Sequence, residues 1–176
     1  PANLMVEQDE DGQLRAYVLD FGLARQAVAG KGMTATGFVM GTVVYMSPEQ
    51  ARGETETMDR RADVYSLGAS LYELLTGLPP YGAAEGMEAL RKIIYEEPLP
   101  PRRRNPEVPR DLETIVLKCL EKDPARRYDT ARALGDDLQR WLEGEPIRAR
   151  PVSARERVGR FARRNKLAVG VAAAAL

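Results

Sequence analysis

The sequence predicts a mainly α-helical, α+β fold that opens with a short β-hairpin and a long loop. Apolar residues recur at helical spacing in four segments, residues 59–76, 84–96, 111–121 and 130–142. Before them, residues 1–6 and 14–19 read as strands, the second through its Tyr and Val side chains. Residues 23–40 show no clear period and contain three glycines, which predicts a loop.

Composition fits one ordinary soluble globular domain, because the 176 residues are 44% hydrophobic and 30% charged. The net charge of +0 gives no global attraction to nucleic acid. The single cysteine, Cys119, excludes an intrachain disulfide, makes a reducing cytosolic setting the default, and is expected to be a buried structural thiol. The sequence has no histidine, so His-based metal sites and catalytic triads are excluded.

The strands are expected to form a hairpin, because the pair Asp11-Gly12 between them suits a turn that needs positive φ. The hairpin would bring Asn3 and Asp20 near each other at one end of its ladder. A carboxylate and an amide oxygen are hard ligands of the kind that Mg²⁺ prefers. The two residues are therefore a candidate cation site, and the alternative is that each only caps a turn.

The chain is organised around residues 20–49. This stretch begins with the letters DFG, contains Thr34 and Thr36 in its later half, and closes with Gly-Thr and Ser-Pro-Glu motifs. A loop of this length without secondary structure is either functional or disordered.

The clearest helix is predicted over residues 59–76. Gly77 and the prolines after it should end this helix. Asp63 lies near the start, where the helix N-terminus stabilises a carboxylate. The expected apolar face consists of Val64, Leu67, Gly68, Leu71, Leu74 and Leu75.

Three further helices follow. Residues 84–96 place Met87, Leu90, Ile93 and Ile94 on one face, residues 111–121 repeat apolar side chains, and residues 130–142 are amphipathic through Leu134, Leu138, Trp141 and Leu142. The Pro-rich residues 97–109 are expected to form a loop. The three arginines at 102–104 in that loop are either a patch for an acidic partner or, the simpler interpretation, solvated.

The character of the sequence changes after Gly144. Residues 147–166 carry seven arginines and one lysine against one acid, and residues 167–176 are uncharged. A membrane span needs about 20 apolar residues, so the last ten are either the start of a span or the end of an Ala-rich helix. A basic cluster before an apolar run is typical of the positive-inside pattern, which favours the span. The alternative for the arginines is a solvated or nucleic-acid-binding tail.

Five motifs in order resemble those of eukaryotic-type serine/threonine protein kinases, in particular the bacterial receptor-like ones. They are P-x-N at the start, DFG, GT with SPE, DVYSLG and DPxxR. The resemblance covers about residues 1–143 and implies most of the kinase large lobe. Residues 144–166 then read as a basic juxtamembrane segment, and residues 167–176 as the start of a transmembrane helix. The implied protein is a membrane-bound kinase with its kinase domain in the cytoplasm, and the alternative is a cytoplasmic protein.

The resemblance implies transfer of the ATP γ-phosphoryl group to Ser or Thr hydroxyls of protein substrates, with Mg²⁺ as the metal. Asn3 and Asp20 would hold the metal ions, and Met5 would lie beneath the adenine. Thr42 would hydrogen-bond the catalytic base, and Pro1 and Thr42 favour Ser/Thr over Tyr specificity. That base belongs five residues before Asn3, upstream of Pro1, so the chain begins and ends as a fragment would and is expected to be inactive alone.

The long loop resembles the activation segment of these kinases. Thr34 and Thr36 match its phosphorylated threonines, with two solvated loop residues as the alternative. A phosphate there adds roughly −1.5 to −2 charge and can order a loop through arginine contacts. Arg25 matches the basic residue that helps to hold the phosphate, and Gly22 completes the DFG motif.

Two structural roles also follow from the resemblance. Glu49 of the SPE motif and Arg127 of the DPxxR motif would form an ion pair, since a planar guanidinium can hold a carboxylate through two bonds. Asp63 would accept hydrogen bonds from the backbone of the catalytic loop. The alternative function is a pseudokinase or scaffold; the retained motif residues argue against it, and no nucleic-acid partner is expected.

Overall fold

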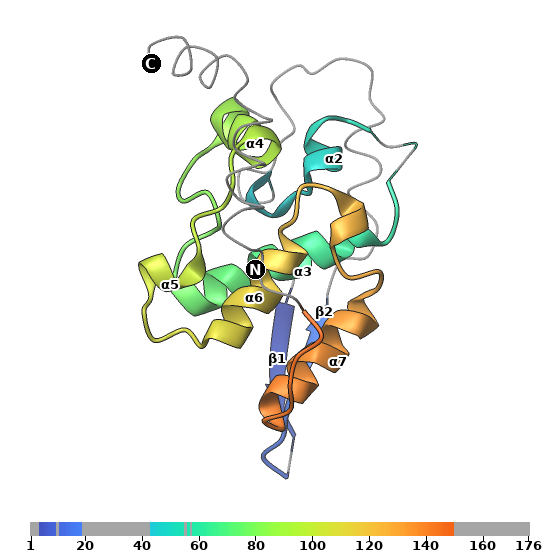
Figure 1. Ribbon diagram of the computed structural model, residues 1–176, viewed down its shortest axis with the longest axis vertical. Helices are drawn as coiled ribbons and strands as arrows, with labels where there is room; N and C mark the ends of the chain where they lie inside the picture. The colour runs from blue at the N-terminus through green and yellow to red at the C-terminus, as the bar shows by residue number, and fades with distance from the viewer. Residues whose placement is uncertain (1–3, 10, 19–42, 55, 57, 150–176) are drawn as a thin grey trace, which may run out of the picture.

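The computed structural model describes residues 4–9, 11–18, 43–54, 56 and 58–149. Its order of elements is a β-hairpin followed by helices, which confirms the predicted mainly helical fold (Figure 1).

Strands β1 (Leu4–Gln8) and β2 (Leu14–Val18) form the predicted antiparallel hairpin, with a register that runs from Leu4 opposite Val18 to Gln8 opposite Leu14. In the turn, the carboxylate of Asp9 accepts hydrogen bonds from the backbone N–H groups of Asp11 and Gln13, at 3.1 and 2.8 Å. Gly12 has a φ of 78°, as the Asp-Gly pair predicts.

Helix α3 (Arg61–Thr76) lies across the middle of the molecule, with α6 (Arg110–Cys119) packed beside it (Figure 1). It begins two residues later than predicted, and the Asp59 carboxylate accepts a hydrogen bond from the backbone N–H of its first residue, Arg61, at 2.8 Å. It ends as predicted at Gly77, whose φ of 75° gives the left-handed cap.

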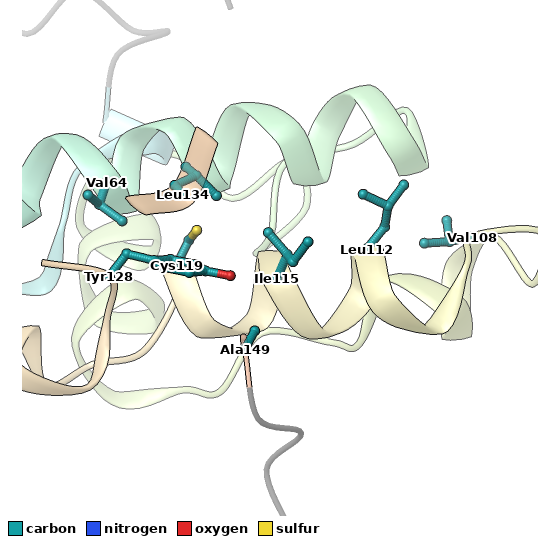
Figure 2. Packing of buried hydrophobic residues seen from close by; sticks show 8 residues of the cluster. All are labelled: Val64, Val108, Leu112, Ile115, Cys119, Tyr128, Leu134 and Ala149. Atoms are coloured by element: carbon teal, nitrogen blue, oxygen red, sulfur yellow. The ribbon is translucent and has the colours of Figure 1, made fainter. Parts of the chain in front are cut away.

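The main hydrophobic cluster fills the space between α3, α6 and α7 (Ala131–Leu142) (Figure 2). Its buried members are Val64, Val108, Leu112, Ile115, Cys119, Tyr128, Leu134 and Ala149. Burial raises the pKa of the Cys119 thiol, which is the buried structural cysteine that the sequence predicts.

A smaller cluster joins η1 (Val43–Tyr45) to α4 (Gly86–Tyr95) through Val43, Tyr81, Ala89 and Ile93. Helix α2 (Pro48–Ala51) follows η1 and also packs on α4, and η2 (Pro124–Arg126) precedes α7. These short elements bring the residues that close the long loop onto the helical body.

Helical periodicity predicted the burial of some apolar side chains wrongly. Leu74, Met87 and Leu142 are exposed, by 68, 67 and 69% respectively, although the spacing puts them on apolar faces. Helix α3 is buried on a second face that the spacing did not reveal, where Tyr65, Ala69 and Tyr72 pack against Val116 and Leu120. The spacing pattern assumes one apolar stripe per helix. It therefore fails for a helix that is buried on two sides.

The predicted loop at residues 97–109 is also partly wrong, because it contains the short helix α5 (Pro101–Arg104). Of the three arginines, only Arg103 is exposed. The guanidinium of Arg104 lies 5.7 Å from the centre of the buried Tyr72 ring, a cation–π contact.

Gly68 lets α3 and α6 approach closely, because a Cβ there would lie 2.3 Å from the Cβ of Cys119. Gly68→Ala should therefore destabilise the chain by about 1–3 kcal/mol through overpacking. Gly135 in α7 is the matched control, since a Cβ there meets no atom within 4 Å. Gly135→Ala should stabilise by about 0.5–1 kcal/mol. Urea denaturation of both variants tests the contrast, and equal effects would contradict it.

Candidate functional site

Seven of the predicted site residues lie outside the described residues, so their roles stay predictions. They are Asn3, Asp20, Gly22, Arg25, Thr34, Thr36 and Thr42. Met5, Glu49, Asp63 and Arg127 lie within the described ranges.

Met5 lies in β1 opposite Tyr17 and is 46% exposed, so it presents an apolar side chain at the surface of the hairpin. Asp63 lies in the first turn of α3 and is exposed. The described residues do not include the catalytic-loop backbone that the kinase resemblance implies as the donor to Asp63, so its structural role stays a prediction.

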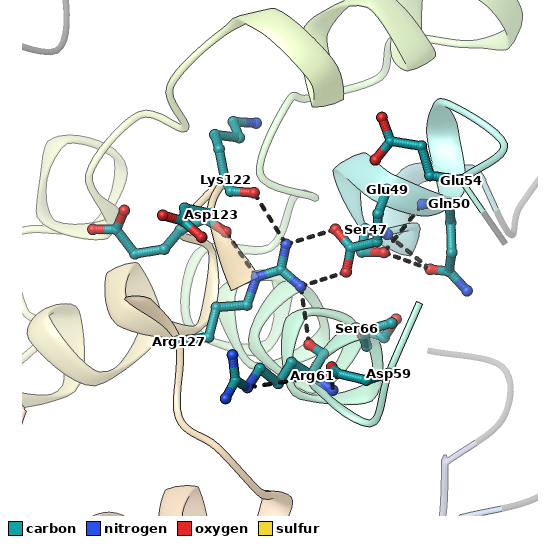
Figure 3. Close-up of polar contacts among 12 residues, drawn as sticks. Ser47, Glu49, Gln50, Glu54, Asp59, Arg61, Ser66, Lys122, Asp123 and Arg127 are labelled. Atoms are coloured by element: carbon teal, nitrogen blue, oxygen red, sulfur yellow. Dashed lines mark hydrogen bonds and ion pairs between the residues drawn. The ribbon is translucent and has the colours of Figure 1, made fainter. Parts of the chain in front are cut away.

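The predicted contact between Glu49 and Arg127 is present, although 78 positions separate the two residues in the sequence (Figure 3). The two terminal nitrogens of Arg127 each donate to one carboxylate oxygen of Glu49, both at 2.7 Å. The side chains are 0 and 7% exposed for Arg127 and Glu49, so water contributes little to solvating either charge. This two-bond geometry is the strong form of an arginine–carboxylate pair.

The remaining N–H groups of Arg127 donate to backbone carbonyls. Nε donates to Glu121 at 2.8 Å, one terminal nitrogen donates to Arg61 at 3.0 Å, and the other donates to Lys122 at 3.3 Å (Figure 3). All five donors of the guanidinium are thus satisfied, as a buried charge requires. The guanidinium also lies 5.0 Å from the centre of the Tyr65 ring on α3.

Local sequence fixes both partners of the pair. Ser47 and Gln50 form a reciprocal capping box around the start of α2, with Pro48 at the first helical position, and this places Glu49 in the first turn. On the other side, the Asp123 carboxylate accepts a hydrogen bond from the backbone N–H of Ala125 at 2.9 Å, which shapes η2 just before Arg127.

The charge of Arg127 also determines the protonation of its partner. Burial by itself raises the pKa of Glu49, but the hydrogen bonds and positive charge of Arg127 outweigh it and hold this pKa below its ordinary value of 4.5. Glu49 is therefore ionised in the folded chain near neutral pH.

A second set of contacts, which the sequence reasoning missed, fixes η1 to α3. The Tyr45 hydroxyl donates to the Glu73 carboxylate at 2.5 Å, and the Ser66 hydroxyl donates to the backbone carbonyl of Tyr45 at 2.9 Å. Burial, together with the hydrogen bond and negative charge of Glu73, raises the pKa of Tyr45 to about 12. Ser66, Ser70 and Glu73 recur at helical spacing between apolar residues of α3, and this polar stripe is the sequence signal that could have indicated the contacts.

The described residues hold no group of three or more acidic, Cys or His side chains that could bind a metal ion. Among the helices in the described ranges, none combines the length and the apolar character needed to cross a bilayer. The predicted metal ligands and the predicted span both lie outside those ranges.

The sequence profile of the family described as "Protein kinase domain" matches residues 1–138. The chain is 45% identical over 146 residues to "Serine/threonine-protein kinase PknB" of Mycolicibacterium smegmatis, which covers 82% of this chain and 22% of that protein. It is 43% identical over 150 residues to the protein of the same name from Mycobacterium tuberculosis, covering 85% of this chain and 23% of that one.

The chain is also similar to a protein whose name indicates tyrosine kinase specificity. "Tyrosine-protein kinase MasK" of Myxococcus xanthus is 42% identical over 142 residues, covering 81% of this chain and 21% of that protein. The family match spans more than half of the sequence, so this chain belongs to the protein kinase family. It corresponds to about a fifth of the length of these curated relatives.

The Glu49–Arg127 pair predicts how stability changes with pH. Because the pKa of Glu49 is depressed on folding, its contribution is complete above 4.5 and is lost as the pH falls through the lower folded-state value. Glu49→Gln should lower the free energy of unfolding by about 3–5 kcal/mol at neutral pH, since it leaves a buried cation unpaired. The difference from the wild type should shrink steadily in acid.

Urea denaturation of the two proteins from about pH 7 down to about pH 3 measures this difference. Glu88→Gln is the control, because it makes the same chemical change at the surface. Glu88 is exposed and pairs with Lys92 at 2.8 Å. The prediction fails if Glu49→Gln has no larger effect than Glu88→Gln, or if its effect grows as the pH falls.

Proposed function

We propose that this chain is the part of a serine/threonine protein kinase that follows its catalytic loop, and that the protein containing it transfers the γ-phosphoryl group of ATP to Ser and Thr residues of proteins in membrane-linked signalling. Kinases of this family use ATP and a divalent metal ion. The observation that carries the proposal is the buried Glu49–Arg127 pair, which joins two of the five motifs across 78 positions.

Asn3 and Asp20 are the residues proposed to hold Mg²⁺. Asn3 directly precedes Leu4, and Asp20 follows Val18 by two residues; Leu4 and Val18 are paired at the end of the hairpin. This register supports a position for both side chains at the same end of the ladder. Mg²⁺ bound there would neutralise charge on the ATP phosphates. Met5, exposed on β1, is proposed to contact the adenine ring.

We propose that residues 41–49 form the surface on which the protein substrate docks. Both ends of the described part of this segment are fixed, η1 by Ser66 and Glu73 on α3, and α2 by Arg127. A rigid docking surface holds the reacting hydroxyl in place, and positioning supplies much of the rate in phosphoryl transfer. Thr42 lies three residues before Tyr45, which contacts α3, and it is proposed to contact the catalytic base.

Control of the reaction is proposed to reside in the loop between Asp20 and Glu49. Phosphorylation of Thr34 or Thr36 would add negative charge, and Arg25 would supply a positive partner. Asp63 is proposed to support the catalytic loop from the start of α3.

The basic residues 144–166 and the apolar residues 167–176 are proposed to attach the protein to a membrane, with the kinase domain on the cytoplasmic side. The support is the order of the two segments, since a cluster of arginines before an apolar run favours retention on the cytoplasmic side.

The kinase assay has two arms. The 176-residue chain with Mg-ATP and a mixed protein substrate should show no transfer, because its sequence does not contain the catalytic-base motif, the Gly-rich loop or the ATP-binding Lys of the family. The natural protein extended upstream through these parts should phosphorylate substrate, and Asp20→Asn in it should reduce transfer to background.

Phosphoamino acid analysis of the product should find phosphoserine or phosphothreonine, and peptide mapping should find phosphate at Thr34 or Thr36. Phosphotyrosine as the main product would contradict the specificity that Pro1 and Thr42 predict. Turnover by the 176-residue chain would contradict its proposed inactivity. An extended protein that is inactive would favour the scaffold alternative, and its recovery in the soluble fraction would contradict membrane attachment.

A further inference from the structure

Asp137 in α7 is a buried carboxylate with no role in the proposed function. It is 1% exposed and accepts three hydrogen bonds. The Tyr128 hydroxyl donates to it at 2.8 Å, and the backbone N–H groups of Arg148 and Ala149 donate at 2.6 and 2.8 Å. Burial favours the neutral acid, but these donors outweigh it and hold the pKa of Asp137 below its ordinary value of 3.8.

The hydrogen bonds to Asp137 hold residues that follow α7 against the lobe. Gly144, with a φ of 71°, reverses the chain after α7, and the following segment runs back beside that helix (Figure 1). Ala149 is buried in the main cluster near Ile115, and Ile147 packs against the same cluster (Figure 2). Residues 147–149, which the sequence assigns to the basic segment, thus pack with the lobe and are named here the exit segment.

Asp137 and Glu49 are connected through two adjacent residues. Arg127 binds Glu49, and Tyr128 binds Asp137; both Arg127 and Tyr128 are buried residues. The backbone at Arg127 is extended, with φ −75° and ψ −178°. Successive side chains of an extended chain point in opposite directions, which is how neighbouring residues reach α2 on one side and α7 on the other.

We propose that residues 127–128 couple the end of the activation segment to the exit segment, so that residues 147–149 dock tightly on Asp137 only while Glu49 holds Arg127. Without Glu49, the buried guanidinium has no anionic partner and must move toward water, because a buried unpaired charge is strongly unfavourable. That movement shifts the shared backbone and withdraws the Tyr128 hydroxyl from Asp137. Linkage requires the reverse effect to be of equal size, so release of the exit segment also weakens the Glu49–Arg127 pair.

The coupling depends only on the fold of the chain and exists whether or not the protein transfers phosphate. If the proposed function is correct, it gives the basic segment a direct route by which to report on, or to alter, the state of the activation segment. The coupling therefore has to be tested by a structural readout and not by activity.

Amide hydrogen exchange of the 176-residue chain, measured by NMR at Arg148 and Ala149, tests the coupling. The rates are compared with that of the buried Ile115 amide, which reports global opening. Asp137→Asn should accelerate exchange at Arg148 and Ala149 by about tenfold or more relative to Ile115. Asp136→Asn is the matched control, because Asp136 is the adjacent, exposed carboxylate of the same helix and should leave the ratio unchanged.

The decisive variant is Glu49→Gln, which lies far from the exit segment in the sequence. It should accelerate exchange at Arg148 and Ala149 by about fivefold or more, within the range typical of coupled sites. Both amides should still exchange faster than Ile115, which shows that they exchange by local opening and not through the global unfolding that this variant also favours. Glu88→Gln should leave the rates at Arg148 and Ala149 unchanged. Tyr128→Phe keeps the buried ring and removes only the hydroxyl, so adding Glu49→Gln to it should give little further acceleration.

The coupling is wrong if Glu49→Gln leaves the exchange rates of Arg148 and Ala149 unchanged, or raises them only to the rate of Ile115, as global unfolding alone would. It is also wrong if Glu49→Gln and Tyr128→Phe act independently. A ratio unchanged in Asp137→Asn would show that the carboxylate does not hold the exit segment at all. If amide exchange shows the coupling in the 176-residue chain but the extended protein has no kinase activity, only the proposed function is contradicted.

Discussion

The buried guanidinium of Arg127 is the interaction on which the rest of the described structure depends. Its donors bind a carboxylate on α2, a carbonyl at the start of α3 and two carbonyls that follow α6. These segments are distant in sequence, and one side chain holds them together. A buried ion pair adds little net stability compared with apolar residues of the same shape, but breaking one costs several kcal/mol (order of magnitude). The pair therefore acts mainly by excluding other positions for residues 47–49.

Helix α3 supplies the framework for this arrangement. It packs on α6 at Gly68, contributes Val64 to one cluster and Tyr65 to another, and uses Ser66 and Glu73 to hold η1. With two apolar faces and one polar stripe, the helix can satisfy all of its contacts in only one rotation about its axis. These contacts give η1 and α2 a defined position on the lobe, which the proposed substrate-docking role of residues 41–49 requires.

Local chemistry made part of the fold predictable from the sequence. Asp11-Gly12 marked the hairpin turn, Gly77 marked the end of α3, and apolar spacing located the four long helices. The Glu49–Arg127 contact came from a different source, the resemblance of two motifs to a known family, because nothing in the spacing relates residues 78 positions apart. Periodicity could not show which apolar side chains would find a partner, so the exposure of Leu74 and Met87 was missed.

The polar contacts that the sequence did not reveal are also long-range. Tyr45 and Glu73 are 28 positions apart, and Asp137 receives backbone donors from beyond a chain reversal. A carboxylate on the surface and one on the buried side of a helix look alike in a sequence, as Asp136 and Asp137 show. Only the packing of the exit segment separates them.

A double-mutant cycle on Glu49 and Arg127, using Glu49→Gln and Arg127→Met, tests most directly whether this pair holds the lobe together. The free energies of unfolding of the wild type, both single variants and the double variant are measured by urea denaturation at neutral pH. A buried pair in which each charge needs the other predicts a coupling energy of about 3 kcal/mol or more, with the double variant far more stable than the sum of the single effects implies. Effects that add to within about 0.5 kcal/mol would contradict it.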